Sequence, residues 1–279
     1  MGISINTNIS ATRASQFLAS NHQNLQKSLD RLSSGKRITQ PADDAGGLAV
    51  SMKLENSINQ LEGAANNIAN AISFLQVQDG ILASAGDIVS RMGELKGLYG
   101  DVLKSTTDKA TYDAEFSDLQ GQLYQLSQSK FNGVDLFDAD GSETFGTVTE
   151  TLNVNVTENG SSGSSVAISQ AALLSGLTFT ITTGVAATKT GAGWSDTNTN
   201  NGNDTVDDGD QSIAVNTGNK LTFGDMNSDL FTLALSNIAT LRASNGGQVK
   251  RLQYAQADVD SKIGNMTAAH GRIMDVDIA

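Results

Sequence analysis

The sequence contains no cysteine, a single proline and two histidines. Without cysteine, the chain can form neither a disulfide nor a thiolate-based metal or redox site. His22 and His270 lie on helical patterns and make a poor zinc site, and the sequence has no HExxH, GxSxG, phosphate-loop or dinucleotide motif. We therefore expect no catalysis, no metal and no cofactor. The near absence of proline leaves long helices uninterrupted.

Basic residues are also scarce, because 18 lysines and arginines stand against 30 aspartates and glutamates, which gives a net charge of −12. Nucleic acids and anionic membranes are bound by clustered positive charge, so neither is an expected partner. No apolar run is long enough to span a bilayer, and the polar, uncharged residues 1–10 do not have the pattern of a cleavable signal peptide.

Residues 41–103 have the pattern of one long amphipathic helix. Apolar residues recur three and four positions apart, which is heptad spacing, at Ile58, Leu61, Ala65, Ile68, Ile72 and Leu75. After Gly80 the spacing resumes one step out of phase, at Ile81, Ala85, Ile88, Met92, Leu95, Tyr99 and Val102. The slip predicts a local distortion of the supercoil. A helix of this length extends about 90 Å, too long for one compact globule to bury, so it needs partner helices.

The predicted partner lies near the C terminus. A seam from Phe231 to Leu241 slips near Gly246 and resumes from Val249 to Ile273 with alternating spacings of three and four. Shorter helices are predicted over residues 3–32 and, after a break at 100–107, over residues 108–131. We expect an α+β fold in which N- and C-terminal segments form an elongated, antiparallel, coiled-coil-like rod. Its packing positions are Ile58, Leu61, Ile68, Ile72, Leu75, Met92, Leu95, Val249, Leu252, Val259, Ile263 and Met266.

Residues 140–228 differ in composition, being rich in Gly, Thr, Asn, Ser and Asp. Short alternating runs predict strands at 148–156, 177–181, 213–215 and 221–223 of a small β-rich outer domain. The predicted organisation is an N-terminal core-type helix and loop (1–40), the N-terminal part of the rod with a hairpin (41–139), the inserted domain (140–228) and the return helix (229–279).

The loop at 191–210 gathers carboxylates and amides, but its spacing does not fit an EF-hand, because Gly202 falls one place late when counted from Asp196. A solvated acidic loop is the expectation, and bound calcium is the alternative. Trp194 in this loop could stack on a sugar, although a lone tryptophan more often serves packing.

Residues 32–54, LSSGKRITQPADDAGGLAVSMKL, closely resemble the signature of bacterial flagellin, in which a short loop leads into a DDAAGLAI motif and the long helix. Pro41 and the acidic pair also suit a helix start. Gly46 and Gly47 indicate either a loose helix start or close packing against a neighbouring subunit. The residues that match family signatures, here and in the RI-x-D-x-D ending of the return helix, are Asp43, Asp44, Gly47, Arg272, Asp275 and Asp277.

This resemblance implies a non-enzymatic structural subunit of the bacterial flagellar filament, which self-assembles with other flagellin copies through helical packing for motility. It also implies an extracellular location, reached through the flagellar type III export apparatus without a cleavable signal peptide. The alternatives are a surface adhesin or glycan-binding protein built on the same rod, and a hook–filament junction protein.

Two further expectations follow from the resemblance. Residues 90–98, SRMGELKGL, resemble the patch that a vertebrate Toll-like receptor reads on flagellins, where Arg91, Glu94 and Leu95 match; the other reading is an exposed helix face with Leu95 in the seam. Family members continue beyond the position of Ala279 in a helix that pairs with the N-terminal one. We therefore expect the N-terminal helix to lack an intramolecular mate, this form to assemble poorly, and export-chaperone binding to fail.

Overall fold

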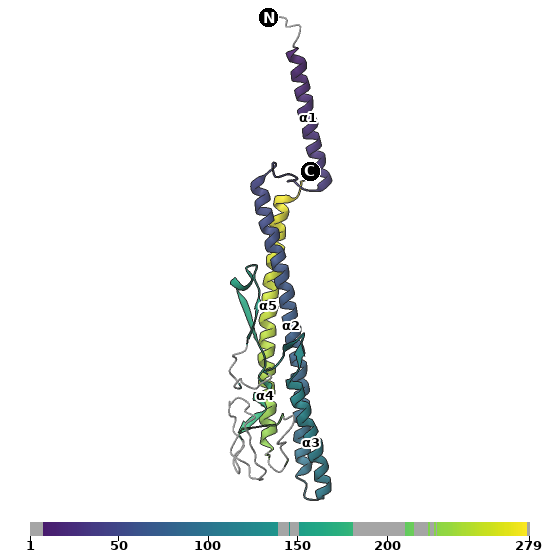
Figure 1. The fold of residues 1–279 in the computed structure, drawn as a ribbon, viewed down its shortest axis with the longest axis vertical. Coiled ribbons are helices and arrows are strands. Elements are labelled where there is room, and N and C mark those ends of the chain that lie inside the picture. Colours follow the sequence, from purple (N-terminus) through teal and green to yellow (C-terminus); the bar gives the residue numbers. More distant parts are fainter. Residues whose placement is uncertain are drawn as a thin grey trace. The chain divides into compact units, whose positions relative to one another are not determined.

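The computed structural model describes residues 8–138, 145, 151–180, 210–214, 223, 226 and 228–277. These residues are mostly helical with a small strand-containing region (Figure 1), which confirms the α+β class. In chain order the elements are α1 (Ile9–Ser34), α2 (Ala45–Tyr99), α3 (Thr106–Ser127), β1 (Lys130–Phe131), β2 (Val134–Asp135), β3 (Thr151–Asn155), the 3-10 turn η1 (Gly160–Ser162), β4 (Ser165–Ser169), α4 (Leu173–Gly176), β5 (Thr178–Thr180), β6 (Asp210–Ser212) and α5 (Asp229–Met274).

The chain divides into two compact units. The first unit comprises Met1–Ala64, Thr157–Asn159 and Asp258–Ala279, and the second comprises Ala65–Val156 and Gly160–Ala257. Both α2 and α5 contribute residues to each unit. No helix in the described ranges has the length and mean hydropathy needed to cross a lipid bilayer.

In the second unit α2 and α5 run antiparallel, because residues later in α2 contact residues earlier in α5. Asn245 donates a hydrogen bond to the carbonyl oxygen of Leu75, and Arg242 pairs with Asp79 four residues farther along α2. Near the end of α2, a Cβ built on Gly93 would lie 3.6 Å from the Cβ of Phe231, so the helices approach closely there. The helix α3 lies beside the C-terminal part of α2 (Figure 1).

The buried face of α2 is one uninterrupted seam. Its members alternate three and four positions apart, at Leu61, Ala64, Ile68, Ala71, Leu75, Gln78, Leu82, Ala85, Val89 and Met92. The predicted phase slip after Gly80 is therefore wrong. The sequence reading followed the bulkiest apolar residues, and Ile72, Ile81 and Ile88 are only half-buried at the flank of the seam.

The predicted slip in α5 is wrong for a related reason. The seam passes from Ile238 through half-buried Leu241, buried Asn245 and half-buried Gln248 to buried Leu252 with unbroken spacing. Two of these positions carry amides, so a search restricted to apolar residues loses the seam there.

The helix ends are set by local hydrogen bonds. Asn8 accepts from the backbone N–H of Ala11 and begins α1, and Gly35 ends it with a left-handed φ of +67°. The long helix is shorter than predicted: it begins at Ala45, after a turn in which Asp43 N donates to Gln40 O, and it ends at Tyr99. Ser105 and Asp108 then form a capping box that begins α3.

The described part of residues 140–228 contains two antiparallel strand pairs, β3 with β4 and β5 with β6. The strands β3 and β5 fall within predicted runs, and β6 ends one residue before the run predicted at 213–215. The strand β4 and the fully buried α4 were not predicted, because Ser- and Gly-rich sequence surrounds them. Trp194 and the loop at 191–210, except its last residue, lie outside the described residues, as does the 221–223 run except for Phe223.

Candidate functional site

The predicted packing positions fall into two groups by burial. Seven have fully buried side chains: Leu61, Ile68, Leu75, Met92, Leu95, Leu252 and Val259. Five are half-buried: Ile58, Ile72, Val249, Ile263 and Met266. The half-buried group keeps apolar surface accessible beside the seam, and burial of such surface against another protein is favourable by about 25 cal/mol per Å².

Amide side chains occupy several buried positions that sequence reasoning missed. The Nδ2 of Asn245 donates to Leu75 O at 2.8 Å, the Nε2 of Gln78 to Leu136 O at 2.6 Å, and the Nδ2 of Asn237 to Gly176 O at 2.8 Å. Buried amides require such partners, and each bond joins residues of the second unit that are far apart in the sequence. The sequence signal that could have identified these buried amides is an Asn or Gln at a heptad position between apolar neighbours.

In the first unit the two signature segments meet through their backbones. The N–H of Arg37 donates to Met274 O at 2.6 Å, and the N–H of Val276 donates to Gly35 O at 3.0 Å. The Nε of Arg37 adds a hydrogen bond of 3.1 Å to Ile273 O. The loop between α1 and α2 is thereby fixed to the end of α5.

The acidic pair of the N-terminal signature has two separate roles. Asp44 Oδ1 accepts a hydrogen bond of 2.8 Å from the N–H of Gly47 and so caps the start of α2. Asp43 instead pairs with Lys27 of α1, with 2.6 Å between Oδ1 and Nζ, and accepts two hydrogen bonds from Thr39. The hydrogen bond from Lys27 is the main cause that lowers the pKa of Asp43 to about 2.

Gly47 is closely packed inside its own chain. A Cβ at this position would lie 2.4 Å from Asp44 Oδ2 and 2.9 Å from Cδ1 of the buried Ile38. At Gly46 the nearest atom would be Asp44 Oδ1 at 3.6 Å, an ordinary contact. The sequence suggested a loose helix start or packing against a neighbouring subunit. The structure gives a different reason for Gly47, which is its contact with Ile38 on the preceding loop.

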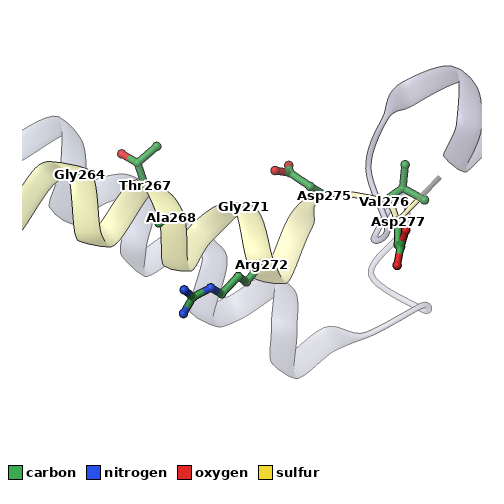
Figure 2. A pocket seen from close by; sticks show the side chains of 8 residues that line it. All are labelled: Gly264, Thr267, Ala268, Gly271, Arg272, Asp275, Val276 and Asp277. Atoms are coloured by element: carbon green, nitrogen blue, oxygen red, sulfur yellow. The ribbon is translucent and has the colours of Figure 1, made fainter. Parts of the chain in front are cut away.

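The C-terminal signature residues Arg272, Asp275 and Asp277 are exposed at the end of α5 and just beyond it. They line an open pocket together with four small residues and one valine (Figure 2), namely Gly264, Thr267, Ala268, Gly271 and Val276. Figure 2 shows the side chains of Arg272 and Asp275 pointing to opposite sides of the helix. The pocket lining offers no nucleophile paired with a base, and the described ranges hold no group of three potential metal ligands.

The predicted receptor patch is an exposed ion-pair cluster. Arg91 pairs with Glu94 at 3.2 Å and with Glu115 of α3 at 2.8 Å, and these hydrogen bonds, the one to Glu115 foremost, raise the pKa of Arg91. Leu95 is fully buried, so it belongs to the seam and is not accessible to a partner in this conformation. Glu115 was missed because it lies on a different helix.

The helix α1 has no buried side chain among its 26 residues. Its apolar residues Leu18, Leu25, Leu29 and Leu32 are between 55% and 73% exposed.

The chain is similar to known proteins over nearly its whole length. Residues 5–142 match the family model described as the bacterial flagellin N-terminal helical region. The chain is 30% identical over 283 residues to the flagellar filament 33 kDa core protein of Treponema phagedenis, covering 99% of this chain and 87% of that protein. It is 30% identical over 297 residues to a flagellin of Bacillus subtilis, covering 99% and 88%. The crystal structure of Bacillus cereus flagellin aligns with a TM-score of 0.45 at 19% identity, covering 74% of this chain and 94% of that one.

Proposed function

Because the chain belongs to the bacterial flagellin family and is a structural subunit of the flagellar filament, an extracellular appendage of polymerised flagellin, we propose how its residues serve that role. The antiparallel pairing of α2 and α5 in the second unit acts as a coiled-coil-like, rod-forming element. The observation that carries this proposal is the unbroken buried seam of α2, which alternates three and four positions from Ile68 to Met92 within this unit. The half-buried packing positions beside it serve contacts to neighbouring copies.

Complementation of a flagellin-deficient motile bacterium tests this proposal. The variant Leu75→Asp places a charge in the buried seam, whereas Gln76→Asp places the same charge on the exposed neighbouring position. We expect Leu75→Asp to reduce the number of filaments in electron micrographs below that of the parent chain, and Gln76→Asp to match the parent chain. Normal filaments from the Leu75→Asp chain would show that the seam is not needed.

We also propose that the chain leaves the cell through the flagellar type III export apparatus without a cleavable signal peptide, and that it has no catalytic role. The absence of cysteine supports the first point, since no disulfide can hold the chain folded during export. The lack of a nucleophile–base pair in the α5 pocket supports the second. Amino-terminal sequencing of secreted protein, from strains with and without a working export apparatus, tests the route.

The organisation proposed from the sequence, with an inserted domain at 140–228, is supported by the contrast in composition. The hydrogen bond of 3.0 Å from Ser169 N to Gln248 Oε1 seats β4 of that insert against α5. Limited proteolysis tests this organisation, and we expect it to cleave the chain only within residues 140–228. Neither the adhesin nor the junction-protein alternative is favoured by a contact among the described residues.

Recognition by a vertebrate Toll-like receptor is a further proposal, supported by the exposure of Arg91 and Glu94. The chain offers a matched control, because Arg91 and Arg242 are both 46% exposed and both paired with carboxylates. In a receptor reporter assay with purified monomer, Arg91→Ala should lose most of the response and Arg242→Ala should retain it. An unresponsive reporter with the parent chain would refute the proposal.

A further inference from the structure

The N-terminal half of α3, in the second unit, has few buried contacts of its own. Of its described residues 106–116, Phe116 alone is fully buried, and the other buried residues of the helix follow in its second half. The ion pair between Glu115 and Arg91 is exposed, and such a pair adds little stability. A helical segment of this length is only marginally stable in water without packing against other elements. The position of this half against α2 therefore depends on what surrounds Phe116.

Phe223, near the end of the inserted region, places a fully buried ring against aromatic residues of two helices. Its ring centroid lies 4.2 Å from that of Phe116 in α3 and 5.4 Å from that of Tyr99, the last residue of α2. Phe116 has one other ring neighbour among the described residues, Phe231 of α5, at 6.2 Å. Tilted and edge-on ring pairs of this kind are favourable beyond the area that they bury. Phe223 is therefore the aromatic residue that links α3 to the end of α2.

The backbone of Phe223 is held by the same two helices. Its N–H donates a hydrogen bond of 3.2 Å to Oδ1 of Asp113 in α3, and its carbonyl oxygen accepts a hydrogen bond from Nζ of Lys96 in α2. Buried backbone groups need partners, and bonds to charged side chains are stronger than those between neutral groups. Phe223 is thus joined to α2 and to α3 through both its ring and its backbone.

We propose that Phe223 is the positioning residue that holds the N-terminal half of α3 against the end of α2. With Phe223 in place, Oε1 of Glu115 in α3 lies 2.8 Å from Nη2 of Arg91 in α2. When this half of α3 opens, Arg91 loses Glu115 and keeps Glu94, its partner on its own helix. The inserted region therefore controls a surface ion-pair cluster to which it contributes no side chain. The inference goes beyond the proposed function, because it concerns the folded monomer and requires no assembly.

The chain provides two matched pairs of variants. Phe223→Ala removes the ring, and Phe179→Ala removes an equally buried phenylalanine of β5 that has no ring contact with a described aromatic residue. Asp113→Ala removes the acceptor of the Phe223 N–H, and Asp118→Ala makes the same change at an exposed position of the same helix. Because Asp113→Ala keeps the ring packing, it tests the proposal even where Phe223→Ala fails to fold.

Amide hydrogen exchange of the full-chain monomer, followed by mass spectrometry, measures the opening of each helix separately. For residues 109–116 we expect exchange to become faster by about tenfold in Phe223→Ala and by about threefold in Asp113→Ala, because local opening no longer breaks these contacts. The same residues should exchange at the parent rate in Phe179→Ala and Asp118→Ala. Residues 68–92 of α2, which carry the buried seam, should exchange at the parent rate in Phe223→Ala and Asp113→Ala.

Parent-like exchange of residues 109–116 in Asp113→Ala and in a folded Phe223→Ala chain would overturn the proposal. Equal acceleration by Phe179→Ala and Asp118→Ala would also overturn it, since the effect would then not be specific to Phe223. Acceleration of residues 68–92 to the same extent in Asp113→Ala would assign the contact to general stability of the unit and would likewise overturn it. The measurement uses monomer, so its outcome does not depend on whether the chain forms filaments.

Discussion

The side-chain amide of Asn245 in α5 donates a hydrogen bond of 2.8 Å to the backbone carbonyl oxygen of Leu75 in α2. Asn245 is 2% exposed, and its Oδ1 has no hydrogen-bond partner among the described residues. A buried amide that is only half satisfied costs stability, yet its one bond forms in a single alignment of the two helices. Asn245 therefore acts as a register-determining residue of the second unit.

Replacement of Asn245 by leucine should separate stability from register. We expect Asn245→Leu to raise the urea midpoint or leave it unchanged, because an apolar residue removes the unsatisfied oxygen. Helix alignment should become less uniform. Cysteines at Gly93 of α2 and Phe231 of α5, whose Cβ atoms would lie 3.6 Å apart, report the alignment through their cross-linking yield. The yield should fall in the Asn245→Leu background, and an equal yield with a lower midpoint would contradict the register role.

Alanine substitution at two glycines of α2 should change stability in opposite directions. Gly47→Ala forces Asp44 or Ile38 to move, and loss of the Asp44 cap alone costs about 0.5–2 kcal/mol. Gly63→Ala meets no described atom within 4 Å and should stabilise the same helix by about 0.5–1 kcal/mol. Thermal unfolding followed by circular dichroism measures both, and shifts of the same sign would contradict the packing argument.

The pKa of Asp43, about 2 against an ordinary value of 3.8, predicts an acid-sensitive contact between α1 and the loop. A lowered pKa in the folded protein means that the contact contributes stability above pH 3.8 and loses that contribution as the pH falls through 2. The carboxyl carbon of Asp43 should titrate near pH 2 in nuclear magnetic resonance spectra. Lys27→Ala should move that midpoint upward, and a midpoint unaffected by the substitution would assign the lowered pKa to another group.

Heptad spacing was sufficient to predict the long helices, because a three-four alternation can bury one face only in a helix. The phase was harder to predict: Ala71 and Gln78 occupy buried seam positions, whereas the bulkier Ile72 and Ile81 lie at its flank. Burial depends on the position of the partner helix as well as on side-chain size.

Individual side-chain contacts between distant segments could not be read from spacing, although the pairing of the two long helices could. Ile38 explains Gly47, and Glu115 completes the cluster around Arg91, yet neither residue belongs to the motif that it supports. The short α4 escaped prediction because its burial comes from tertiary contacts, such as that between Gly176 and Phe145, and four residues carry little periodicity. Local sequence patterns were enough to predict the long helices. Which faces of these helices pack together depends on contacts between segments that are far apart in the sequence.

The buried seam and the exposed ion pair of the α2–α5 pairing should differ in their contribution to stability. Leu252→Ala removes a fully buried side chain and should lower the free energy of unfolding by about 2–5 kcal/mol. Arg242→Ala breaks a pair whose side chains are 46% and 42% exposed, and solvent screening limits its effect to about 0.2–1 kcal/mol. Urea unfolding monitored by circular dichroism measures both differences, and added salt should shrink only the second. If Arg242→Ala costs as much as Leu252→Ala, then electrostatic pairing rather than apolar burial holds the two helices together.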